Sequence, residues 1–274
     1  MGTSHNAGFT IIETMLFLAI TGMLIAGLLV GVGTSLNIQR YHDSVTSLKS
    51  FLQSQYSAVT NVENDRDGTW NCNTSAATTQ SGTTQNPGQS DCVLIGRYIM
   101  IDGGATTVAT VVANPPPDVN GTSGDIGDLK ANYTLGLSTV SEQIDSLAWG
   151  TVIAWPVAGT SSQNEPSAPT NAPMPRSIAI LIIRSPESGS VYTFTADNPP
   201  AIGSMNNGKL KAMLKIGVGT PPSQEARTIC VDSQGLVLAS LNMAVYLHAY
   251  ATDQTSVETR SNDTSAALGS GLKC

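Results

Sequence analysis

One carboxylate, that of Glu13, lies within an otherwise uncharged and mostly apolar run from Phe9 to Val32. A charged side chain at the centre of a membrane helix costs about 3 kcal/mol on insertion scales and is retained mainly where a partner or a function requires it. The chemistry that such a group offers is charge pairing, because a carboxylate and a cation attract strongly in a low dielectric while either is expensive to bury alone. Glu13 is therefore the first candidate functional residue.

Four cysteines follow the apolar run, and their use fits an oxidising compartment. Three pairings are open in principle. A bond between Cys72 and Cys92 would close a polar, low-complexity loop, and a bond between Cys230 and Cys274 would hold a tail at residues 261–273. A metal site is the alternative, but neither a CxxC motif nor clustered histidines support it.

Catalytic residues are not indicated by the sequence. Its three histidines, His5, His42 and His248, do not stand in spacings typical of a nucleophile or a metal cage. The glycines complete neither a dinucleotide-binding motif nor a phosphate-binding loop. A net charge of -7 disfavours nucleic acid as a partner, since phosphate contact needs a basic surface. We expect a protein that is not an enzyme and needs no cofactor.

One long helix is predicted to carry Glu13. The residues from Phe9 to Val32 would span about 36 Å, enough to cross a bilayer core of about 30 Å. After them, apolar residues recur every three or four positions, which predicts an amphipathic helix packed on a globular domain. These residues are Ile38, Tyr41, Val45, Leu48, Leu52, Tyr56 and Val59. Neither Gly nor Pro interrupts residues 34–67, so we expect the helix to continue to about Val62.

The rest of the chain is typical of an antiparallel β-domain, because short β-branched runs alternate with Gly, Pro and Asn clusters. The predicted strands are 93–101, 106–113, 147–155, 177–184, 191–195, 228–231 and 236–250, while 210–216 fits either a strand or a short helix. Long irregular stretches at 64–91, 114–128 and 159–175 are candidates for partner contacts. The expected fold class is α+β, with the long helix packed on an antiparallel sheet.

The residues Gly8-Phe9-Thr10-Ile11-Ile12-Glu13 resemble the class III signal of type IV pilins and pseudopilins, in which Glu is the fifth residue after the Gly. The resemblance implies that a prepilin peptidase cuts between Gly8 and Phe9 on the cytoplasmic side and methylates the new amine of Phe9. It also implies that this amine and Glu13 of neighbouring subunits neutralise one another in a filament core. The alternative is a plain signal-anchor, with Glu13 near the lipid headgroups.

The same resemblance divides the chain into four parts. They are a leader at 1–8, a transmembrane and filament-core helix at 9–36, an amphipathic half at 37–62 and an extracytoplasmic β-rich head at 63–274. A bond between Cys230 and Cys274 resembles the C-terminal disulfide loop of many pilins. Residues 227–237 resemble the strand-turn-strand near the C-terminus of minor pilins and H-type pseudopilins.

Pilins often carry a proline in the middle of the apolar helix, whereas this chain has none before residue 87. Its weak points are Gly22, Gly27, Gly31 and Gly33, each about 0.5 to 1 kcal/mol less favourable than Ala. Small residues also let a second helix approach closely. We favour this packing role, and melting of the helix in a filament stays open. Two lesser alternatives also stay open: calcium at Asp118, Asn120, Asp125 and Asp128, and glycosylation at Asn73, Asn120, Asn132 and Asn262.

The function implied is that of a structural subunit, a minor pilin, in a type IV pilus that serves adhesion, motility or uptake. Its partners would be the prepilin peptidase, other pilin subunits, the inner-membrane assembly platform, the membrane before assembly and a host-surface receptor. The chain would be a single-pass protein of the cytoplasmic membrane first and part of a cell-surface filament afterwards. The alternatives are a pseudopilin of a type II secretion or competence system and a tip subunit of the adhesin type.

Overall fold

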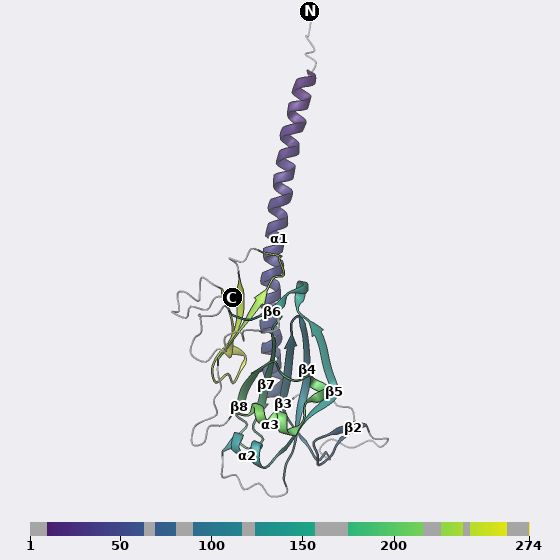
Figure 1. The fold of residues 1–274 in the computed structure, drawn as a ribbon, viewed down its shortest axis with the longest axis vertical. Coiled ribbons are helices and arrows are strands. Elements are labelled where there is room, and N and C mark those ends of the chain that lie inside the picture. The colour runs from purple at the N-terminus through teal and green to yellow at the C-terminus, as the bar shows by residue number, and fades with distance from the viewer. Residues whose placement is uncertain are drawn as a thin grey trace, which may run out of the picture.

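Helix α1 runs without a break from Ile11 to Asn61 and joins an apolar shaft to a β-rich head (Figure 1). The computed structural model describes residues 10–62, 69–80, 90–116, 124–156, 175–215, 226–237, 242–261 and 274. Val62 ends α1 in the left-handed conformation, and its N–H donates to the carbonyl of Ala58. The observed helix agrees with the predicted one, and the combination of this helix with antiparallel sheets confirms the α+β class.

Among the described residues, two antiparallel sheets and a small hairpin form the head. The larger sheet has the order β5 (Thr134–Ser146), β4 (Ala105–Asn114), β3 (Val93–Asp102), β7 (Ser177–Arg184) and β8 (Val191–Asp197). The smaller sheet has the order β11 (Val257–Ser261), β10 (Met243–Leu247), β9 (Arg227–Asp232) and β6 (Val152–Ala154). The hairpin pairs β1 (Trp70–Cys72) with β2 (Thr78–Gln80).

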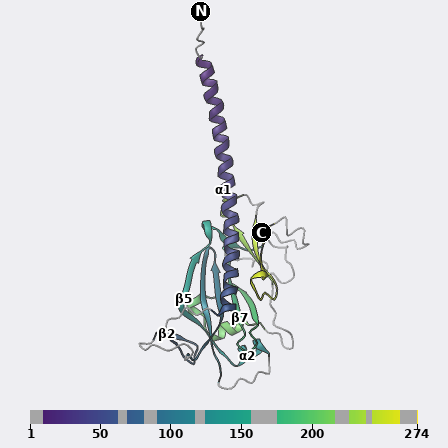
Figure 2. The ribbon, with the colours of Figure 1, turned by 180° about the vertical axis from the view of Figure 1, so that it is seen from behind.

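Both faces of the larger sheet are covered. Successive side chains of a strand point to opposite faces, so Ile178, Ile180 and Ile182 of β7 pack toward α1 and the smaller sheet, in one core cluster. The residues between them pack with α2 (Asp125–Ala131) and α3 (Asn207–Met213) in a second cluster. Helix α1 lies behind the larger sheet in Figure 1 and in front of it in Figure 2. A strand buried on both faces explains the nearly continuous apolar run of β7.

The amphipathic half of α1 follows the predicted stripe. Tyr41, Val45, Leu48, Leu52, Tyr56 and Val59 are all buried in the core that α1 shares with both sheets. Ile38, the first residue of the predicted stripe, is only half-buried, because the helix leaves the head at this level. We call this point, around residues 38–43, the neck.

Several elements differ from the prediction. Residues 147–155 contain the 3-10 turn η1 (Ala148–Gly150) before the three-residue strand β6. At 210–216, where strand and helix were both open, α3 forms a helix that ends at Met213, and residue 216 lies outside the described residues. Residues 64–91 contain the β1–β2 hairpin. Strands β5 and β11 were not predicted, because their sequences are rich in Thr, Ser, Gln and charged residues. Both lie at the edges of their sheets, where within the described residues one side of the strand pairs with no other strand and polar residues are tolerated.

Candidate functional site

Glu13 lies in the first turn of α1, three residues after the helix cap. Thr10 is the N-cap residue, and its hydroxyl accepts a hydrogen bond from the backbone N–H of Glu13 at 3.3 Å. A Thr followed three residues later by Glu is the sequence of a capping box, and a carboxylate there also interacts favourably with the helix dipole. This local role was not predicted, although the Thr-x-x-Glu spacing signals it. Gly8 and Phe9, the expected processing residues, lie outside the described part of the chain.

Apolar side chains cover the shaft on all sides. The exposed ones are Ile11, Ile12, Met15, Leu16, Phe17, Leu18, Ile20, Met23, Leu24, Ile25, Leu28, Leu29, Val30, Val32 and Leu36. A helix of a soluble domain usually has one apolar face, whereas an apolar surface all round requires a lipid or protein environment. Within the described residues, α1 is the one helix long and apolar enough to span a membrane.

The threonine hydroxyls of the shaft are satisfied within the helix itself. The hydroxyls of Thr14, Thr21 and Thr34 donate to the carbonyls of Ile11, Phe17 and Val30, at 2.9, 2.7 and 3.0 Å. An unpaired hydroxyl in hydrocarbon would be unfavourable, and this back-bonding to the preceding turn removes that penalty. The three threonines are therefore compatible with a lipid-facing surface.

The glycines of the shaft leave open space on its surface. A Cβ atom built at Gly22, Gly27, Gly31 or Gly33 would have no neighbour within 4 Å. The helix continues through all four residues without a kink in its hydrogen-bonded ladder. Gly22 and Ala26 lie four residues apart on one face, a spacing of small residues that lets the backbones of two membrane helices approach closely.

Tyr41 bonds the upper end of the packed half of α1 to the smaller sheet. Its hydroxyl donates to the carbonyl oxygen of Val231 at 2.7 Å and accepts from the N–H of Met243 at 2.7 Å. Val231 and Met243 face each other on β9 and β10. Burial raises the pKa of the Tyr41 hydroxyl above its usual value. Tyr41 thus occupies the end of the β9–β10 ladder and ties the helix to it.

Tyr56 provides a second polar attachment, near the lower end of α1. Its hydroxyl lies 2.8 Å from Thr193 Oγ1, which donates in turn to the carbonyl of Ala251 at 2.8 Å. Thr193 belongs to β8 in the larger sheet, and Ala251 follows β10 of the smaller one. Tyr56 therefore donates to Thr193, and this relay joins α1 to both sheets.

Arg176 immediately precedes β7, is fully buried and connects the two sheets. Its Nη2 and Nε donate to one carboxylate oxygen of Asp197 at 2.7 and 3.0 Å, and its Nη1 donates to the carbonyl of Thr228 at 2.8 Å. The guanidinium also lies over the Trp155 ring, 4.5 Å from the ring centroid. A buried charge is costly unless it is paired and hydrogen-bonded, and here each of the three guanidinium nitrogens donates a hydrogen bond.

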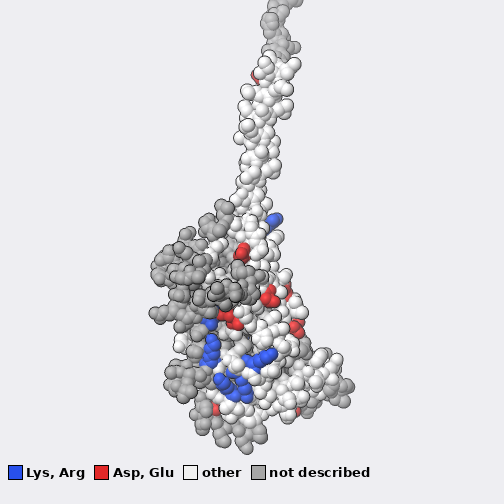
Figure 3. Space-filling view, viewed as in Figure 1, with Lys and Arg blue, Asp and Glu red and all other residues white. Residues whose placement is uncertain are grey.

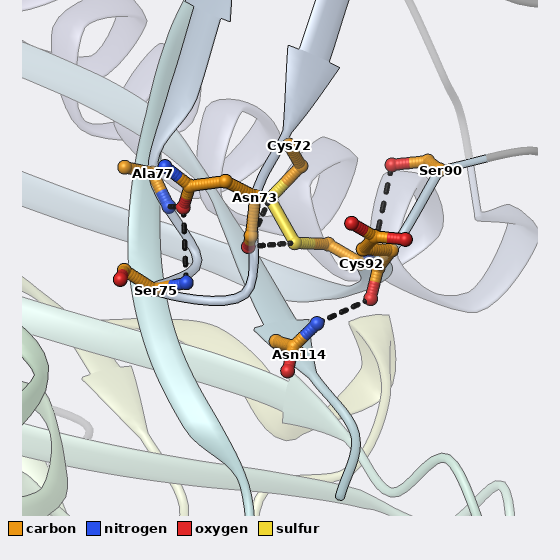
Figure 4. Close-up of a disulfide and its surroundings, with 8 residues drawn as sticks. Cys72, Asn73, Ser75, Ala77, Ser90, Cys92 and Asn114 are labelled. Atoms are coloured by element: carbon orange, nitrogen blue, oxygen red, sulfur yellow. Dashed lines mark hydrogen bonds between the residues drawn. A yellow bond between two sulfur atoms is a disulfide. The ribbon is translucent and has the colours of Figure 1, made fainter. Parts of the chain in front are cut away.

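The first disulfide joins Cys72 to Cys92 and attaches the β1–β2 hairpin to the start of β3 (Figure 4). In the turn of the hairpin, the side-chain oxygen of Asn73 accepts from the N–H groups of Ser75 and Ala77. The turn packs closely on β5, where a Cβ atom at Gly136 would lie 1.9 Å from the carbonyl oxygen of Ala76. The pairing is the one that the sequence analysis considered for this loop.

The second disulfide joins Cys230 in β9 to Cys274. The side-chain N–H of Asn242 donates to the carbonyl of Cys274 at 2.6 Å, so residue 274 is held at the smaller sheet by a covalent and a polar contact. This is the second of the pairings considered from the sequence. Because Tyr41 bonds to Val231, the residue after Cys230, the disulfide and the helix attachment are adjacent on β9.

Two of the other candidate residues, Asp125 and His248, are engaged by neighbouring side chains. Asp125 accepts hydrogen bonds from Ser188 and Tyr192, and His248 lies half exposed after β10 with its Nε2 3.3 Å from a carboxylate oxygen of Glu258. Asp118 and Asn120 lie outside the described residues. Within the ranges that the structure describes, no three His, Cys, Asp or Glu side chains gather as a metal site would require.

Comparison with known proteins adds no relative: no protein-family model, curated protein or solved structure matches this chain. The candidate site is therefore defined by its own geometry, an apolar shaft with one carboxylate in its first turn, continuous with a helix that is bonded into a disulfide-linked head.

Proposed function

We propose that this protein is a structural subunit of the type IV pilin class, a minor pilin, which assembles into a filament through the apolar half of α1. The observation that carries the proposal is the shaft. From Ile11 to Leu36 exposed apolar side chains lie on every side of the shaft, and Glu13 is its single charged residue. Such a surface is stable in a bilayer before assembly and in a bundle of similar helices afterwards.

Moving the shaft from lipid to a helix bundle gains little from the hydrophobic effect, because lipid tails are as apolar as leucine side chains. Close packing and polar contacts must then select the neighbours. The small residues Gly22 and Ala26 allow close packing, and the carboxylate of Glu13 provides a polar contact. On this proposal, cleavage before Phe9 frees an amine, and the amine of one subunit pairs with Glu13 of the next. The axial spacing of the subunits follows from this pair.

The processing partner is a prepilin peptidase, and the assembly partners are sibling pilins and the inner-membrane assembly platform. The chain first resides in the cytoplasmic membrane, with its head outside, and afterwards in a cell-surface filament. A pseudopilus of a secretion or competence system would use the same shaft in the same way. Sheared filaments from the native cell should contain a chain that starts at methylated Phe9, by intact-mass and N-terminal measurement. If this chain is the dominant protein of the preparation, it is a subunit of the filament body. If it is present only in traces, it is a tip or accessory subunit.

A substitution at Glu13 tests the charge pair. Glu13→Gln keeps the capping box, which accepts Glu or Gln, but removes the negative charge. We expect normal cleavage and a normal amount of protein in the membrane, with little incorporation into filaments, because losing one partner of a buried ion pair costs about 3 to 5 kcal/mol. Glu142→Gln, an exposed position on the head, is the matched control and should assemble normally. Normal incorporation of Glu13→Gln would refute the pairing.

A further inference from the structure

The shaft separates two charged levels by a distance that matches a lipid bilayer. No Asp, Glu, Lys or Arg occurs between Glu13 and Arg40. A continuous helix places these two residues about 40 Å apart, which is the thickness of a bilayer with its headgroup regions. Figure 3 shows the same pattern, a white shaft with one acidic spot near its free end and one basic spot where it meets the head. If Glu13 lies at one membrane surface, Arg40 lies at the other.

An exposed tryptophan of the head lies at the same level as Arg40. Trp149 belongs to η1, between β5 and β6, and its side chain is 52% exposed. Its indole N–H donates to a carboxylate oxygen of Asp43 at 2.8 Å, and the guanidinium of Arg40 lies over the ring, 5.1 Å from the centroid. We call Arg40, Asp43 and Trp149 the neck cluster. These contacts hold a large apolar ring against the helix while half of it faces outward.

The backbone of Trp149 is held in an unfavourable conformation. Its φ and ψ are 60° and 22°, in the left-handed region that bulky residues seldom adopt, and Gly150 follows with a φ of 68°. Residues in sparsely populated backbone regions persist where the surrounding structure determines them, and they are enriched at functional positions. Here the two consecutive left-handed residues turn the chain so that the indole meets α1. Nothing in the packing of the described core requires a tryptophan at this exposed position.

The chemistry of the neck cluster suits a membrane surface. Tryptophan is enriched at the headgroup level, where its ring is apolar and its N–H polar, and arginine places its charge there while its stem contacts apolar groups. Asp43 is engaged by the indole N–H, and the exposed guanidinium of Arg40 can meet a lipid phosphate. We propose that the neck cluster binds the headgroup layer of the bilayer before assembly and sets the depth of α1 and the orientation of the head. The inference rests on the proposed membrane-spanning state of α1.

Depth-dependent quenching of tryptophan fluorescence tests the contact. The full chain is reconstituted in phosphatidylcholine vesicles that contain lipids brominated either near the headgroup or at the end of the acyl chain. We expect the shallow bromines to quench the wild-type protein, and Trp149→Phe to lose most of this quenching. Trp70→Phe is the matched control, because Trp70 lies in β1 of the hairpin, and it should keep the shallow quenching. In Arg40→Gln, the ratio of quenching by the shallow bromines to quenching by the deep bromines should change.

The outcomes separate this inference from the proposed function. If the protein floats with the vesicles but Trp149→Phe is quenched as strongly as the wild type, the neck cluster does not contact lipid and only this inference fails. If the protein does not float with the vesicles at all, the membrane-spanning state fails as well. If Trp149 is unquenched in vesicles but becomes inaccessible to aqueous quenchers in filaments, its partner is a neighbouring subunit, and the lipid assignment is overturned.

Discussion

The hydroxyl of Tyr41 donates to the backbone carbonyl of Val231, 190 residues later in the chain, at 2.7 Å. The same oxygen accepts from the N–H of Met243, so one phenol completes the hydrogen bonding of both β9 and β10 at the neck. The helix that carries the shaft is thereby joined to the strand that carries Cys230. Tyr41 therefore ties the helix to two strands of the head through one side chain.

We expect Tyr41→Phe to destabilise the head by about 2 to 4 kcal/mol, because the change leaves one buried donor and one acceptor without a partner, at about 1 to 2 kcal/mol each. Urea unfolding of the full chain in detergent, followed by near-ultraviolet circular dichroism, measures the loss. Tyr250→Phe is the control, since Tyr250 is exposed and should change the free energy of unfolding by less than about 0.5 kcal/mol. Equal stability of the two variants would show that Tyr41 acts only through its ring.

Replacing Arg176 should have the larger effect. Arg176→Met leaves the carboxylate of Asp197 and the carbonyl of Thr228 without their donor, and we expect a loss of about 3 to 5 kcal/mol. Urea unfolding followed by tryptophan fluorescence suits this variant, because Trp155 lies against the guanidinium.

Two controls sharpen the Arg176 prediction. Arg260→Met removes a charge from the ion pair with Glu258, which is partly exposed, and should cost less than about 1 kcal/mol. Adding Asp197→Asn to Arg176→Met should recover part of the loss, since it removes the uncompensated charge. A double variant no more stable than Arg176→Met would mean that the unpaired carbonyl and the lost packing dominate.

Ionisation of Tyr98 should destabilise the folded protein at alkaline pH. It is fully buried in β3, and burial raises its pKa to about 12, whereas a tyrosine in an unfolded chain has a pKa of about 10. The raised pKa of Tyr98 therefore contributes about 2 to 3 kcal/mol to the free energy of unfolding. This contribution is complete below about pH 10 and is lost between about pH 10 and 12. Unfolding curves at rising pH, with tyrosinate absorbance as the probe, measure it.

Tyr98→Phe should move this alkaline transition to higher pH. Within the described residues the Tyr98 hydroxyl is buried without a hydrogen-bond partner, so its removal also relieves a desolvation penalty at neutral pH. We expect the variant to be as stable as the wild type at pH 7, or more so. An unchanged alkaline midpoint would assign the transition to other groups, of which Tyr41 and Tyr56 also have a raised pKa through burial.

Local sequence patterns predicted the elements that are regular and apolar. The stripe from Tyr41 to Val59 marked the packed half of α1, and the apolar run at 177–184 predicted strand β7, whose burial on both faces came from the structure. Strand β5 was missed because its burial comes from β4 beside it and α3 above it, while its own residues resemble a loop. Helix α3 begins at the cap of Asn206, whose side chain accepts from the N–H of Lys209, a signal that the strand alternative overlooked.

Long-range polar contacts could not be predicted in the same way. Arg176 meets Asp197 and Thr228 from separate strands, and no spacing in the sequence links the three. Trp149 reads as part of an apolar strand, and only the left-handed backbone at residues 149 and 150 reveals that it turns toward the helix. The candidate site shows the same division. Glu13 was identified from its apolar surroundings, whereas the neck cluster required the fold.

The unbroken course of α1 has a mechanical consequence. A pull on the apolar end acts along the axis of the packed half, parallel to its interface with the two sheets. The hydrogen bonds of Tyr41 to Val231, of Ser44 to Thr151 and of Tyr56 to Thr193 are then loaded together in shear. They must therefore break at the same time and cannot break one after another. Tension that enters β9 beside Cys230 reaches residue 274 through a covalent bond. A head built in this way is suited to stay folded while a force is transmitted along its stem.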